Sequence, residues 1–124
     1  MAKKVRTFAP GEGVVIEMGF AYEGDREIES VEAVFVREGS GDEITFLGDA
    51  REETSVQGQE VRYAARLEAR IRPDASPGEY RCAHLSARDR LDDDWDFTDA
   101  SRLDLVVRVE GGPRRLKVTT SDFL

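Results

Sequence analysis

The 124-residue chain has one cysteine, Cys82, and no asparagine. One cysteine excludes an internal disulfide and any metal site built from several thiolates, and the lack of asparagine excludes N-glycosylation. The 18 basic residues are outnumbered by 26 acidic residues, which gives a net charge of −8. Because phosphate binding needs an excess of Lys and Arg, this balance argues against nucleic acid and anionic membrane as partners.

Long apolar runs are also missing, since no stretch approaches the roughly 18 residues of a membrane-spanning helix. The basic start of the chain reaches Pro10 and Glu12 before any apolar segment, so no signal peptide is predicted. A complete chain with this start is expected in the cytoplasm. Helical periodicity never persists over about eleven residues, and the length fits a single domain.

The sequence does contain runs in which apolar and polar residues alternate with a period of two. From 61 to 71 every odd-numbered residue is apolar, and most residues between them are charged. This pattern predicts a strand with one buried face and one solvent-exposed face. Shorter strand-like runs cover 14–22, 28–37, 43–47, 79–87 and 102–110. Gly48-Asp49 is predicted to end the third of these runs, and 50–59 to be a polar turn.

Six to seven strands without a helix predict an all-β fold in which two antiparallel sheets pack as a sandwich. The segment from Asp74 to Cys82 adds detail, because Pro77-Gly78 forms a turn and Tyr80 stands two residues before the cysteine. It resembles the tyrosine corner of immunoglobulin-type domains and the penultimate strand of bacterial immunoglobulin-like and fibronectin type III-like modules. The resemblance implies an immunoglobulin-like antiparallel β-sandwich of about seven strands, with the Tyr80 hydroxyl closing the corner.

We place this domain at residues 5–111 and a C-terminal tail or extra edge strand at 112–124. The chain departs from antibody domains in two ways. No second cysteine is available for a disulfide between sheets, and Trp95 lies outside the predicted strands. Function does not follow from the resemblance, because this fold carries many unrelated functions.

The acidic segment 89–99 is the first candidate site, with six carboxylates in eleven residues. We predict a solvated hairpin loop whose partner-binding residues are Asp93, Trp95 and Phe97, because aromatic residues on loops are favoured anchors. For Trp95 and Phe97 the alternative is that one or both fold back onto the end of the sandwich as a small core, because large aromatic side chains are usually buried. The alternative is a calcium site, because Asp92, Asp94 and Asp96 have the spacing that opens an EF-hand loop. The rest of that motif is absent, so a second acidic loop would have to contribute.

Two further groups of side chains are candidate sites. Arg62, Arg66 and Arg70 project from the exposed face of one strand, and we expect them to pair with acidic residues of adjacent strands, for example Asp104 and Glu110. Cys82 and His84, two residues apart, are the only thiol and the only imidazole. We interpret Cys82 as a small core residue with His84 beside it or at a bulge, because nothing signals the cleft and oxyanion donors that a catalyst needs.

The sequence therefore predicts a non-catalytic binding module that recognises a macromolecular partner through loops or sheet edges. It predicts no enzyme activity and no cofactor, with calcium as the open alternative. The expected partner is a protein, and a homodimer could form through an edge strand or the tail.

Overall fold

The computed structural model describes residues 4–23, 27–55, 60–89, 95–98, 103–111 and 118–123, and these contain strands but no helix. No helix long and apolar enough to cross a membrane occurs among these residues. The strands are β1 (Lys4–Phe8), β2 (Gly13–Glu23), β3 (Ile28–Arg37), β4 (Glu43–Ser55), β5 (Glu60–Arg70), β6 (Gly78–Asp89), β7 (Trp95–Thr98) and β8 (Leu105–Val109). The predicted all-β class is confirmed.

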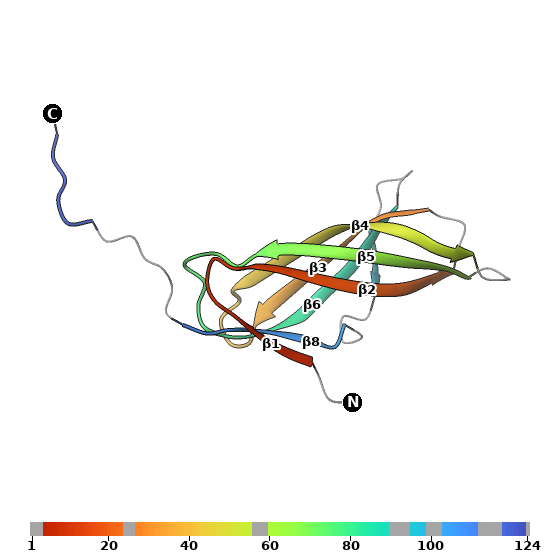
Figure 1. Cartoon of the computed structure of the whole chain (residues 1–124), viewed down its shortest axis with the longest axis horizontal. Helices are drawn as coiled ribbons and strands as arrows, with labels where there is room; N and C mark the ends of the chain where they lie inside the picture. The colour runs from red at the N-terminus through yellow and green to blue at the C-terminus, as the bar shows by residue number, and fades with distance from the viewer. Residues whose placement is uncertain are drawn as a thin grey trace.

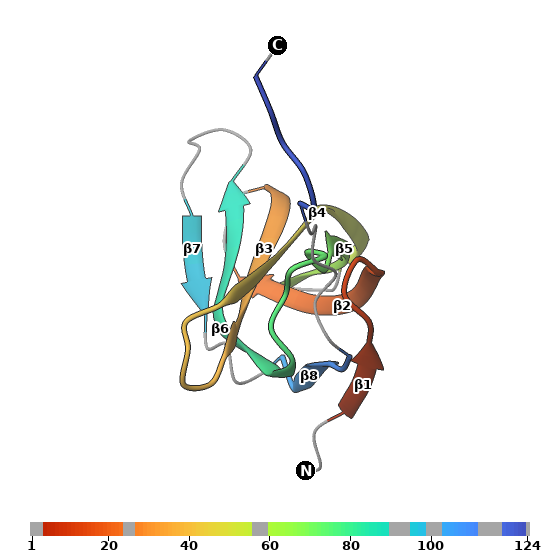
Figure 2. The same cartoon turned by 90° about the vertical axis from the view of Figure 1, so that its left-hand side faces the viewer.

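All eight strands belong to one sheet with the order β1-β8-β6-β3-β4-β5-β2, and β7 pairs with β6 outside this path. One edge of β6 is shared, because its first residues pair with β8 and its last residues pair with β7. The sheet twists along its length and curls around a common interior (Figures 1 and 2). The outcome is an almost closed, barrel-like sheet.

This arrangement differs from the predicted sandwich. Seven strand pairs link the described strands into one sheet, and β1 runs parallel to β8, so the sheet is mixed instead of wholly antiparallel. β1 was missed because four of its five residues are exposed and show no alternation. An immunoglobulin-like arrangement of two layers is therefore not confirmed.

The core is built from the inward faces that alternation predicts. On β5, Tyr63, Ala65 and Leu67 are buried, while Arg62, Arg66 and Arg70 are exposed. β3 lies in the middle of the sheet. Its Phe35 ring packs against Phe46 of β4 with a centroid distance of 5.0 Å. On β8 the alternation is incomplete, because Val106 is buried as well as Val107 and Val109.

Gly48 is a correction to the predicted strand ends. β4 continues through Gly48-Asp49 to Ser55, and Leu47 and Ala50 keep one register with Glu68 and Ala65 of β5. A Cβ atom on Gly48 would overlap the carbonyl oxygen of Arg66. The glycine permits a close approach of two backbones within a strand, and it does not end the strand.

The turn from β1 to β2 fixes where these two strands separate. The Glu12 amide donates to the carbonyl oxygen of Ala9 at 3.1 Å, Pro10 follows Ala9, and Gly11 has a φ of 86°. This is the geometry of a type II turn, which favours proline and then glycine. The Gly11 amide donates to the carbonyl oxygen of Ile71, so the turn is tied to the end of β5. From this turn β1 and β2 diverge (Figure 1).

The described part of the C-terminal tail, 118–123, forms no strand. Val118 is 70% exposed and Phe123 is 97% exposed. An added edge strand within the same chain is therefore not present in these six residues.

Candidate binding edge at strand β2

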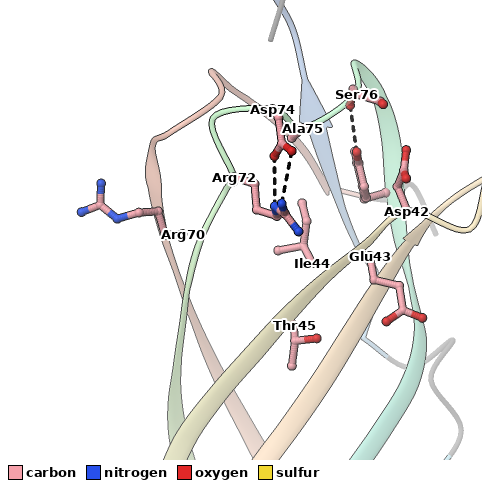
Figure 3. Close-up of a pocket in the computed structure, with 10 residues that line it drawn as sticks. Asp42, Glu43, Ile44, Thr45, Arg70, Arg72, Asp74, Ala75 and Ser76 are labelled. Atoms are coloured by element: carbon pink, nitrogen blue, oxygen red, sulfur yellow. Dashed lines mark hydrogen bonds and ion pairs between the residues drawn. The ribbon is translucent and has the colours of Figure 1, made fainter. Parts of the chain in front are cut away.

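The tyrosine corner is present, as the resemblance implied. Tyr80 is buried, and its hydroxyl donates to the carbonyl oxygen of Ser76 at 2.8 Å (Figure 3). Next to it, hydrogen bonds from Ser76, Ser40 and Arg37 lower the pKa of Asp42, more than its partial burial raises it. These contacts hold the β3–β4 turn against the segment that leads into β6.

A cavity of about 310 Å³ opens beside this corner, and four of its charged side chains form hydrogen bonds or ion pairs within the protein (Figure 3). Arg72 reaches both carboxylate oxygens of Asp74, at 3.0 and 3.2 Å. Arg70 donates to the carbonyl oxygen of Gly11 at 3.1 Å, and its side chain points away from the cavity. Asp42 pairs with Arg37 at 3.3 Å. The geometry is that of a structural clamp more than of a ligand site.

Cys82 and His84 lie at a β-bulge. The β6–β3 register passes from Cys82 opposite Phe35 to His84 opposite Val34, so Ala83 is the extra residue. The Cys82 thiol donates to the carbonyl oxygen of His84 at 3.3 Å, and burial raises the pKa of Cys82 to about 11. An activated cysteine nucleophile has a lowered pKa, so the environment of this thiol works against such a role.

The acidic segment is placed only in part. Residues 95–98 form β7, which pairs antiparallel with β6, with Trp95 opposite Arg88 and Phe97 opposite Ser86. Asp92, Asp93 and Asp94 lie outside the described residues, as do the side chains of Trp95, Asp96 and Phe97. Where side chains are described, no group of three or more His, Cys, Asp or Glu residues could hold a metal ion. The calcium and partner-binding assignments in this segment stay predictions.

The arginine stripe is exposed as predicted, but the example partners Asp104 and Glu110 are wrong. β5 lies between β2 and β4, whereas Asp104 and Glu110 flank β8 on the other side of the sheet. Arg66 instead lies 3.7 Å from Glu68 of its own strand. The chain order of strands did not reveal which strands are neighbours.

The two terminal strands of the sheet differ sharply. β1 has five residues and carries Lys4 and Arg6, so it has the short length and basic charge that protect an exposed strand edge. β2 has eleven residues, each in register with β5 without a bulge, and it contains no Lys, Arg or Pro. β2 ends the strand order, so its outer edge has no partner among the described strands. This edge lacks the usual protection against pairing.

Three hollows are lined by residues of β2 together with other described residues. One, of about 350 Å³, lies between β1, β8 and β2 and includes Val5, Phe8 and Val15. A second, of about 650 Å³, lies on the outer face where Gly19 of β2 is opposite Ala64 of β5. A third lies at the start of β2 beside Ala69. Only the first of these hollows lies on the open side of β2, because the other two are lined by β5 or β4 on its paired side.

The chemistry that this edge offers is backbone hydrogen bonding, with one hollow beside residues 14–17 on its open side. That is the mode by which a sheet binds an extended segment as an additional strand. Sequence analysis located the strand at 14–22 but missed that it lies at an edge. No signal in the sequence marked the edge, because a regular strand without lysine, arginine or proline is typical of a strand that is paired on both sides.

Comparison with models of protein families, with curated proteins and with solved structures finds no match for this chain.

Proposed function

We propose that this protein is a non-catalytic interaction module that binds an extended segment of a protein by strand addition to the free edge of β2. One observation carries the proposal: β2 is a long, regular terminal strand without lysine, arginine, proline or a bulge. Val15 supports it, because this apolar side chain is 48% exposed on β2. A segment added at this edge would pair with the backbone of β2 and cover part of Val15.

The proposal also concerns the architecture of the sheet. The sheet is an immunoglobulin-like arrangement in which the two layers have remained joined into one curled sheet. The bond from the Tyr80 hydroxyl to Ser76 supports this, since such a corner is typical of immunoglobulin-like sandwiches. An experimental structure without two facing layers would contradict the architectural proposal.

A display library of random peptides, selected against the full-length chain, tests strand addition. The selected peptides are then measured against two variants with the same added charge. Val15→Lys places a lysine on the edge strand, where lysine opposes pairing. Leu47→Lys places one on β4, a strand paired on both sides, where Leu47 is 54% exposed. Both side chains are exposed, so both variants are expected to fold.

We expect the selected peptides to bind the wild type and Leu47→Lys alike and to lose binding to Val15→Lys. Amide hydrogen exchange should slow in residues 13–23 when a peptide is bound. Selected peptides that bind Val15→Lys as well as the wild type would contradict the proposal, as would a monomeric wild type that enriches no binder from the library.

A further inference from the structure

We infer that the segment which pairs with β2 is β2 of a second copy of this chain, joined antiparallel about a twofold axis at Met18. The inference rests on the proposed function, because it names the partner of the same edge. In this pairing residue 13 lies opposite residue 23 of the second copy, and all eleven residues of β2 take part. The two sheets become one continuous sheet through the axis.

The charges on β2 favour this register over the alternatives with the axis at Glu17 or Phe20. Glu17 and Glu23 are its only charged residues. An axis at Glu17 would place the two Glu17 side chains opposite each other, and an axis at Phe20 would place Glu17 opposite Glu23. Like charges directly opposite one another destabilise a strand pair. With the axis at Met18, each glutamate faces a glycine, since Glu17 meets Gly19 and Glu23 meets Gly13.

The apolar residues match in the same register. On the outer face Val15 lies opposite Ala21 of the second copy, and both are exposed in the single chain. On the inner face Ile16 lies opposite Phe20 of the second copy. Adjacent aromatic and β-branched residues across a strand pair stabilise that pair. Each partner thus supplies the apolar cover that the other lacks.

The same symmetry limits the size of the assembly. A twofold contact uses the β2 edge of both copies, so no β2 edge is left for a third chain. The opposite end of the sheet is β1, which is short and basic and resists pairing. The expected species is therefore a closed dimer instead of an open filament.

Sedimentation equilibrium of the full-length chain over a range of concentrations tests the inference. We expect twice the chain mass of 13.9 kDa for the wild type and for Leu47→Lys. Val15→Lys should remain a monomer, because its lysine would have to lie against Ala21 of the second copy. Each copy carries a charge of −8, so added salt should shift the wild type toward the dimer by screening repulsion between the copies.

Disulfide trapping tests the register. Opposite residues of an antiparallel pair have Cα atoms about 4.5–5.5 Å apart, within the range that a disulfide spans. The double variant Val15→Cys/Ala21→Cys should form a covalent dimer on mild oxidation, through two 15–21 bonds. Val15→Cys alone should not, because its two thiols would lie about 20 Å apart along the strands. Cys82 is common to both variants, so it cannot account for a difference between them.

The outcomes separate the two proposals. A wild type that stays monomeric while selected peptides bind β2 would overturn the dimer and leave strand addition intact. A dimer that Val15→Lys does not disrupt, or an assembly larger than a dimer, would overturn the inference by placing the contact elsewhere. A dimer without cross-linking in Val15→Cys/Ala21→Cys would overturn the register at Met18.

Discussion

At the scale of single residues, Gly48 shows how packing overrides a local signal. Gly-Asp is a frequent turn pair, yet here it lies inside a thirteen-residue strand, because only glycine leaves room for the Arg66 carbonyl oxygen. The residues near Gly48 in the sequence do not indicate that contact, because Arg66 lies on a different strand. The contact exists only once β4 and β5 are paired.

Gly48→Ala should destabilise the fold by about 1–3 kcal/mol, the usual cost of forcing an extra carbon into a packed site. The matched control is Gly19→Ala on β2, where the new Cβ would lie 3.8 Å from the nearest backbone atom, the carbonyl oxygen of Tyr63. Its effect should stay within about 0.5 kcal/mol. Urea denaturation of the three proteins measures both values, and equal midpoints for Gly48→Ala and wild type would contradict the expectation.

Cys82 should be a slow nucleophile in the folded protein. Its pKa is raised to about 11 by burial, so the reactive thiolate is scarce at pH values near neutrality. Reaction with a coloured disulfide reagent near pH 8 should be much slower in the native chain than in the same chain unfolded in urea. If Cys82 reacted as fast in the folded protein as in the unfolded chain, its thiol would be accessible and its pKa would not be raised, which would contradict the expectation.

At the scale of elements, ionic contacts join turns and strands that are distant in the sequence. Arg108 of β8 donates to Glu79 of β6 at 2.8 Å, and Arg81 contacts the same carboxylate at 3.1 Å. The hydrogen bond from Arg108 is the main reason why the pKa of Glu79 is lowered. Asp42, whose pKa is also lowered, plays a similar part at the β3–β4 turn. Both carboxylates bind protons less readily in the folded state.

Stability should therefore fall in acid. Groups with a lowered folded pKa contribute stabilisation that is complete above their ordinary pKa of about 4, and it is lost as the pH falls through the folded value. The Tm of the wild type should be nearly constant above about pH 5 and decrease below about pH 4. The variant Asp42→Asn/Glu79→Gln should lose less of its Tm over the same interval. An identical acid slope in both proteins would assign the acid sensitivity to other groups.

The β6–β7 hairpin contains most of the acidic segment 89–99. Because Asp96 belongs to β7, the three aspartates of the calcium hypothesis are divided between a strand and the residues before it. We expect calcium to leave the Tm of the full-length chain unchanged, as for a solvated hairpin. A rise in Tm with calcium that disappears in Asp92→Asn/Asp94→Asn would favour the calcium site instead. Magnesium at equal concentration serves as the control for ionic strength.

At the scale of the whole molecule, the sheet depends on pairs that join distant parts of the chain. β1 pairs with β8, and β2 pairs with β5, so the core is incomplete until both ends of the chain are in place. Folds dominated by such pairs fold slowly, because loop closure costs entropy before the contacts form. Stopped-flow refolding should show formation in milliseconds to seconds, and unfolding should be a single cooperative transition. A microsecond folding phase that accounts for the full signal would contradict this.

Particular residues show which features of the fold could be predicted from the sequence and which could not. The buried positions of β5 and the bounds of β3 were predicted correctly, since each depends on alternation within one segment. The Tyr80 corner was also predicted, from the residues 74–82. The parallel partner of β1 was missed because it lies at the far end of the chain. The continuation of β4 beyond Gly48 and the strand at 95–98 were missed because each depends on pairing with a neighbouring strand and not on alternation. The candidate site changed accordingly, from the acidic segment to the edge of β2.

The sequence by itself determined where most strands lie and which of their faces are buried. Alternation is local, and burial of apolar side chains requires only that each strand present one face to the interior. The tertiary structure decided which strands are neighbours and which edge stays open. Backbone amides and carbonyls are the same at nearly every residue, so their pairing leaves little trace in the sequence. The free edge of β2 is for that reason a property of the folded sheet.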